Sequence, residues 1–144
     1  MDGVRIFGLG ALALALMVLA SGCRSSVPLQ PVTGKVTFKG ALLSYGVVVF
    51  TPDASRGESG RVAVGTIRPD GTYTLNTDDA AGAGPGWYRI TVSAFNSPPP
   101  KTLAPEPFQP PVPLLPEKYR DPELSTLRCQ VKANQTNSID LNLD

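Results

Sequence analysis

Apolar and polar residues alternate with a period of two along most of the chain after residue 31, and this pattern limits the fold more than any other feature. In 31–38 (PVTGKVTF) and 87–95 (WYRITVSAF) every second residue is apolar or small. Such a period places alternate side chains on opposite faces of a β-strand, whereas a helix repeats every ~3.6 residues. The segment 46–50 (GVVVF) is instead a continuous apolar run, typical of a strand covered on both faces. We predict strands over 31–38, 46–50, 61–67, 72–76, 87–95, 126–132 and 138–144, and no helix.

Turn signals indicate how these strands connect. Pro69-Asp70-Gly71 combines a proline that fixes φ with a glycine that tolerates positive φ, so 61–67 and 72–76 are expected to form a hairpin. About seven short strands at this spacing are typical of an antiparallel β-sandwich. The predicted fold is therefore all-β, with one sandwich domain over 31–144. The inward rows of its last two strands are Leu127, Cys129, Val131 and Ile139, Leu141, Leu143.

The first 22 residues have a different composition. Residues 6–20 (IFGLGALALALMVLA) carry no charge, and Arg5 provides a short basic start before them. This run of 15 residues is short for a helix that must cross about 30 Å of hydrocarbon, and its layout is that of a signal peptide. We therefore predict a signal peptide over 1–22.

The residues Leu19-Ala20-Ser21-Gly22-Cys23 resemble the bacterial lipobox. In lipoproteins with this box the chain is cut before the cysteine, and the resemblance implies cleavage between Gly22 and Cys23 and lipid attachment to the Cys23 thiol. Acyl chains would hold the protein on a membrane without a spanning helix, with 23–30 as a lipidated tether. Ordinary secretion and an uncleaved anchor remain as alternatives. Arg24 stands where an Asp would resemble an inner-membrane retention signal, which favours the outer membrane, on its periplasmic or surface face.

Nine of the chain's 15 prolines lie in 98–116. Proline fixes φ and donates no backbone hydrogen bond, so this segment is expected to form an extended, polyproline-like excursion from the domain and not an interior strand. A docking segment for a partner is one interpretation. A stiff loop laid over the sandwich, with Phe108, Leu114 and Leu115 packed on it, is the interpretation we favour.

The chain contains no histidine, and this excludes most hydrolytic mechanisms. Without an imidazole there is no Ser-His-Asp triad, no Cys-His pair and no HExxH zinc site. The net charge is +1, from 13 Lys+Arg and 12 Asp+Glu, with no basic patch that would attract nucleic acid. We predict neither an enzyme nor a nucleic-acid partner.

The acidic residues and the second cysteine give no specific functional signal. Asp78-Asp79 lacks the ligand spacing of an EF-hand and is interpreted as a solvated turn. Glu117, Asp121 and Glu123 could supply paired carboxylates like those of glycosidases, but no substrate cleft is indicated. Residues 117–121 are instead expected to anchor the returning chain through Tyr119. Cys129 is predicted to be a buried apolar residue, with a reactive thiol as the alternative. No catalytic, cofactor or metal site is predicted.

Several ordered motifs carry a family resemblance. Residues 34–43 (GKVTFKGALL), 46–52 (GVVVFTP), 69–75 (PDGTYTL) and 85–92 (PGWYRITV) resemble small bacterial carboxypeptidase regulatory-like lipoproteins. The closing parts 115–119, 125–131 and 137–143 are similar to theirs as well. The resemblance implies a transthyretin-like or prealbumin-like sandwich, of Ig-like architecture, without catalytic residues of its own.

Two functional hypotheses follow. The first is a lipid-anchored structural or interaction module of the cell envelope, whose loops contact a protein partner. The second is a carbohydrate- or peptidoglycan-binding module that uses an exposed aromatic ring, with Trp87 and Tyr88 as the candidate contacts and Tyr73 and Tyr45 as further aromatic residues. Alternation places Trp87 and Tyr88 on opposite faces, so at most one of them is exposed. Core packing is the competing interpretation for each ring.

Overall fold

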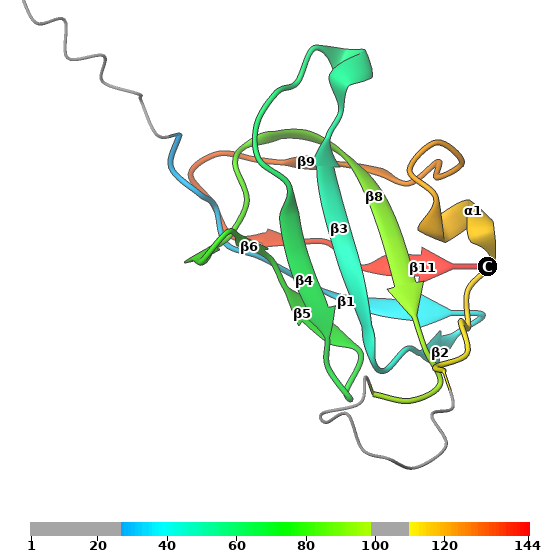
Figure 1. Ribbon diagram of the computed structural model, residues 1–144. Helices are drawn as coiled ribbons and strands as arrows, with labels where there is room; N and C mark the ends of the chain where they lie inside the picture. The colour runs from blue at the N-terminus through cyan, green and yellow to red at the C-terminus, as the bar shows by residue number, and fades with distance from the viewer. Residues whose placement is uncertain (1–26, 99–109) are drawn as a thin grey trace, which may run out of the picture.

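The computed structural model describes residues 27–98 and 110–144, which form two β-sheets packed around one core (Figure 1). The all-β prediction is confirmed at this level. The predictions for Gly22, Cys23, Arg24 and Phe108 lie outside the described residues. The strands are β1 (Val32–Phe38), β2 (Ala41–Leu42), β3 (Gly46–Pro52), β4 (Ala63–Ile67), β5 (Thr72–Thr74), β6 (Asn76–Thr77), β7 (Ala80–Ala81), β8 (Gly86–Ala94), β9 (Arg128–Val131), β10 (Asn137–Ser138) and β11 (Leu141–Leu143).

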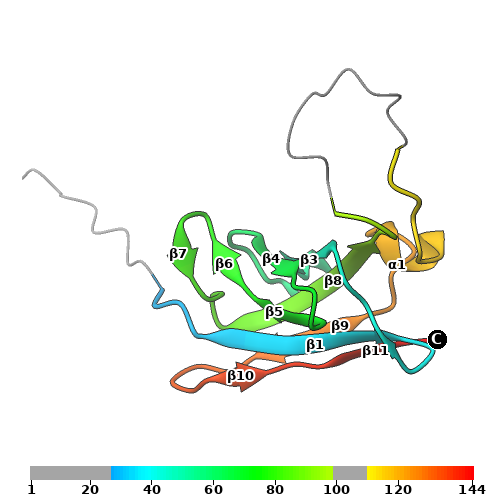
Figure 2. The same ribbon diagram turned by 90° about the horizontal axis from the view of Figure 1, so that it is seen from below.

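One sheet contains six strands in the order β7-β6-β4-β3-β8-β9. In the other, β1 pairs with β2, β5, β10 and β11. Figure 2 shows the two layers nearly edge-on, with β1, β10 and β11 in one layer and β3, β4 and β8 in the other. The core lies between the layers, and its largest fully buried side chains are Tyr73, Phe50, Ile67, Leu75 and Ile90.

The predicted faces are confirmed wherever the alternation is regular. In β8 the inward row of Tyr88, Ile90, Val92 and Ala94 is 0 to 4% exposed. In β11, Leu141 and Leu143 are buried while Asn142 is exposed. Burying these apolar rows, at roughly 25 cal/mol per Å² removed from water, drives the two sheets together.

Strand number and direction differ from the prediction. The described residues contain eleven short strands instead of about seven. Two predicted strands are divided, 72–76 into β5 and β6 and 138–144 into β10 and β11, and the two-residue strands β2 and β7 form where none was predicted. The sandwich is not wholly antiparallel, since β1 pairs in parallel with both β10 and β11. Alternation defines which face of a strand is buried and carries no information about the direction of its neighbour.

The predicted hairpin is only partly present. Its turn forms as expected, with the Arg68 N–H donating to the Thr72 carbonyl at 2.8 Å and Gly71 at a φ of 77°. The chain then leaves the first sheet, because β5 pairs with β1 and only Asn76 of β6 pairs with Val64 of β4. The turn chemistry fixes a local reversal, whereas the burial of Tyr73 and Leu75 decides which sheet receives the returning strand.

Other local predictions were wrong in detail. The strand β3 is buried on one face only, since Val47 and Val49 are half-buried. A one-turn helix, α1 (Glu117–Arg120), forms where no helix was predicted, and it places Tyr119 in the core as expected. In the described end of the proline-rich segment Leu115 is buried, whereas Leu114 is 41% exposed. None of the described residues forms a helix long and apolar enough to span a membrane.

Candidate functional site

A short loop after β3 organises a cluster of polar residues. Asp53 caps a three-residue 3-10 turn, η1 (Ala54–Arg56), and its Oδ1 accepts hydrogen bonds from Ser55 N (3.2 Å) and Ser55 Oγ (2.6 Å). Gly57 ends the turn at a φ of 77°, a left-handed conformation that favours glycine. The loop is thereby held in one conformation, with Arg56 projecting from its last position.

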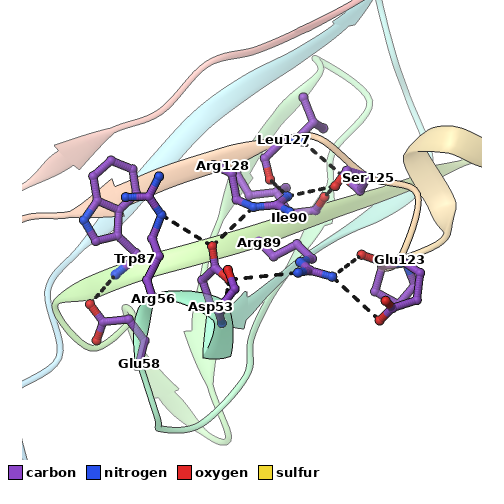
Figure 3. A network of polar contacts seen from close by, with 12 residues as sticks. Asp53, Arg56, Glu58, Trp87, Arg89, Ile90, Glu123, Ser125, Leu127 and Arg128 are labelled. Carbon is purple, nitrogen blue, oxygen red and sulfur yellow. Dashed lines mark hydrogen bonds and ion pairs between the residues drawn. The ribbon is translucent and has the colours of Figure 1, made fainter.

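Three arginines from different segments converge on the Asp53 carboxylate (Figure 3). Arg128 Nε of β9 lies 3.3 Å and Arg56 Nε 3.6 Å from Oδ2, and Arg89 Nη2 of β8 lies 4.0 Å from Oδ1. Asp53 is only 1% exposed. Hydrogen bonds from Ser55, together with the Arg128 and Arg89 charges, hold the pKa of Asp53 below its ordinary value. The carboxylate therefore stays ionised and joins the loop to both strands.

Trp87, the first predicted ligand contact, lies beside this cluster on the outer face of β8. Its indole is half-buried, and the Arg56 guanidinium carbon lies 4.1 Å from its ring centroid. The backbone N–H of Trp87 donates to Glu58 Oε1 at 3.1 Å. Trp87 is therefore a surface aromatic that is partly covered by an arginine.

Tyr88, the second predicted contact, is a core residue. It is 4% exposed, its ring centroid lies 5.9 Å from that of Phe50, and its Oη donates to the Gly84 carbonyl at 2.9 Å. Tyr73 is also fully buried. Of the two predicted ligand contacts, only Trp87 reaches the surface.

Asp53 was not among the candidate residues identified from the sequence. A signal was present, because Asp53 and Gly57 bracket a short turn with a typical capping residue at each end. The arginines could not be found in this way, since Arg89 and Arg128 reach Asp53 only through the β3-β8-β9 pairing.

The predicted acidic pair lies elsewhere. Asp78 Oδ2 pairs with Arg61 Nη1 at 2.5 Å, and both side chains are largely exposed. These residues and Asp79 line a groove of about 760 Å³ that also contacts Val27 and Leu29. Of the other carboxylates, Glu123 Oε1 lies 3.7 Å from Arg89 Nη1, which connects it to the Asp53 cluster.

Cys129 is half-buried and packs against the core, so its prediction as a buried apolar residue is confirmed in part. Burial raises the pKa of its thiol to about 12.

The reactivity of Cys129 can be tested in the Cys23→Ala variant. We expect the folded protein to react with a thiol reagent at pH 8 at least about a hundredfold more slowly than the unfolded chain, because the thiolate is the reacting form. A disulfide reagent followed by absorbance, with and without denaturant, measures this. Fast native labelling contradicts it.

The comparisons place no known protein beside this chain: no family model, no curated protein and no solved structure matches it. The structure shows a mostly-β protein with two packed sheets. The resemblance to carboxypeptidase regulatory-like lipoproteins therefore remains a hypothesis.

Proposed function

We propose that this protein is a lipid-anchored, non-catalytic module of the bacterial cell envelope, with a transthyretin-like sandwich. A lipid on Cys23 attaches it to a membrane, and the Arg24 position favours the outer membrane. The sandwich acts as an interaction or structural domain for an envelope partner. The proposed role involves neither a cofactor nor a nucleic acid.

Only a few residues separate the lipobox from the start of the fold, and this supports the proposal. Gln30, seven positions after Cys23, is 7% exposed and exchanges two backbone hydrogen bonds with Ala83, of 2.8 and 3.0 Å. An extended chain covers at most about 3.6 Å per residue, so the tether spans no more than about 25 Å. A domain on so short a tether stays close to the membrane, as expected of an envelope module.

The lipid anchor is tested by labelling with radioactive or clickable palmitate in cells. We expect the wild-type protein to be labelled and the Cys23→Ala variant to lose the label completely, because the thiol and the new N-terminus are the acylation sites. The matched control is Cys129→Ala, which removes the other cysteine and keeps the label. Equal labelling of wild type and Cys23→Ala rules out the anchor.

Glycan binding is the second candidate function, and the partial exposure of Trp87 supports it. An indole at a protein surface offers an apolar face on which a sugar ring stacks. Polar groups are close to it, because Arg56 and Glu58 of the loop after β3 contact Trp87 and Gln130 of β9 pairs with it. Binding to peptidoglycan would suit a protein held in the envelope.

The glycan hypothesis is tested with isolated murein sacculi in a pull-down assay. We expect Trp87→Ala to reduce binding at least about tenfold, because loss of aromatic contact area removes a few kcal/mol of interaction. Trp87→Phe, the control, keeps an aromatic ring and part of the binding. Circular dichroism must show that both variants remain folded. Unchanged binding of Trp87→Ala excludes Trp87 as the contact.

A further inference from the structure

One oxygen of the Asp53 carboxylate lacks a hydrogen-bond donor among the described residues. Oδ2 is buried, and no described residue donates a hydrogen bond to it. The two arginines nearest to it approach as ion pairs, with Arg128 Nε at 3.3 Å and Arg56 Nε at 3.6 Å. Buried polar atoms are nearly always hydrogen-bonded, so Oδ2 retains the capacity to accept a donor.

Arg56 lies over both this oxygen and the Trp87 ring. Its guanidinium stacks 4.1 Å from the indole centroid while its Nε faces Asp53 Oδ2, as Figure 3 shows. The Arg56 side chain is itself 50% exposed and extends from the last residue of a three-residue turn. A rotation of this one side chain toward solvent would uncover the indole face of Trp87 and remove one of the two arginines beside Asp53 Oδ2, with Arg128 Nε still 3.3 Å from that oxygen.

The charges around these two groups indicate the kind of ligand. Arg56, Arg89 and Arg128 are balanced by Asp53, Glu58 and Glu123, so the cluster has no net charge to attract an anion. An ionised carboxylate accepts hydrogen bonds and donates none. The matching ligand carries an apolar face for the indole and a hydroxyl for Asp53, and a neutral sugar ring has both.

We propose that Arg56 is a movable lid over a neutral-saccharide site, in which Trp87 is the stacking platform and Asp53 Oδ2 accepts a sugar hydroxyl. This proposal rests on the glycan-binding function and adds to it two residues and a gating step. In the closed form Arg56 occupies the place of the sugar on the indole. The ligand binds only the open form, so its apparent affinity falls by the fraction of time the lid is closed.

Trp87 is the only tryptophan of the chain, so its fluorescence reports directly on the site. Without ligand, we expect Arg56→Ala to increase quenching of this fluorescence by acrylamide, because the indole face opens. Titration of the full chain with a β-1,4-linked N-acetylglucosamine oligomer should show binding about two- to fivefold tighter in Arg56→Ala than in wild type, the change that corresponds to loss of one exposed cation–π contact. Arg61→Ala is the matched control, since Arg61 lies on the same loop and pairs with Asp78 instead.

The acceptor is tested separately with Asp53→Asn in the same titration. We expect at least tenfold weaker binding, and circular dichroism must show a folded protein; if it does not, Arg56→Ala alone decides. Binding by wild type that is unchanged in Arg56→Ala overturns the lid and leaves the glycan function standing. Absence of binding by wild type and by Arg56→Ala overturns both.

Discussion

Replacing Gly34 by alanine is expected to lower the free energy of unfolding by roughly 3 kcal/mol or more, since overpacking against backbone is among the costliest single changes. Gly34 lies in β1 and faces the core. A Cβ at this position would collide with the carbonyl of Ile139 and lie 2.9 Å from Cε1 of Tyr73. Neither neighbour can withdraw, because Tyr73 Oη donates to the Ile139 carbonyl at 2.6 Å and the Ile139 N–H donates to Thr33 at 2.8 Å. Urea unfolding measures the loss as a lower midpoint.

Gly84→Ala is the matched control for this variant. The atom nearest to its added Cβ is Tyr88 Oη, 3.4 Å away, which is an ordinary contact, and Gly84 does not adopt a positive φ. We expect a change of no more than about 1 kcal/mol in either direction. Similar losses in both variants would show that the close approach of β1, β5 and residue 139 is not what requires glycine at position 34.

The burial of each strand face could be predicted from the sequence, but the pairing of the strands could not. The alternation of β8 correctly separated Tyr88 from Trp87, because side-chain direction depends only on the local period of two. The parallel pairing of β1 with β10 and β11 joins residues more than 100 positions apart, and no local pattern encodes it. The pairing of β5 with β1 directly after the turn is likewise a tertiary effect, in which burial of Tyr73 overrides an adequate hairpin turn.

Of the residues in the candidate site, only Trp87 could be predicted from the sequence. Trp87 was identified because large aromatics stand out in a sequence with few of them. Asp53 was not, since a lone aspartate after a proline is most often a turn residue. Its importance comes from the β3-β8-β9 order, which brings Arg89 and Arg128 to one carboxylate from positions 36 and 75 residues further along the chain. A charge cluster of this kind becomes visible only when the sheet is known.

Replacing Asp53 by asparagine should destabilise the protein at pH 7 more than the loss of any exposed carboxylate. Asparagine keeps an oxygen for Ser55 but removes the charge on which the three arginines converge, and Arg89, 22% exposed, cannot fully regain its hydration. Removing one partner of a buried ion pair is costly because the remaining charge is left uncompensated. Thermal unfolding followed by circular dichroism measures this as a lower melting temperature.

The pH dependence distinguishes this charge effect from a packing defect. The pKa of Asp53 is lowered in the folded protein, chiefly by the hydrogen bonds from Ser55. Its contribution to stability is therefore fully present above the ordinary carboxyl pKa of about 3.9. That contribution is lost as the pH falls through the lower pKa of the folded protein. The melting temperatures of wild type and Asp53→Asn should therefore differ most near pH 7 and converge below about pH 4. Asp70→Asn is the control. The pKa of Asp70 is also lowered, by hydrogen bonds from Thr72, but no arginine among the described residues forms an ion pair with it, so its curve should follow the same direction with a smaller separation. If the wild-type and Asp53→Asn curves stay parallel from pH 7 to pH 2, the arginine cluster does not depend on the Asp53 charge.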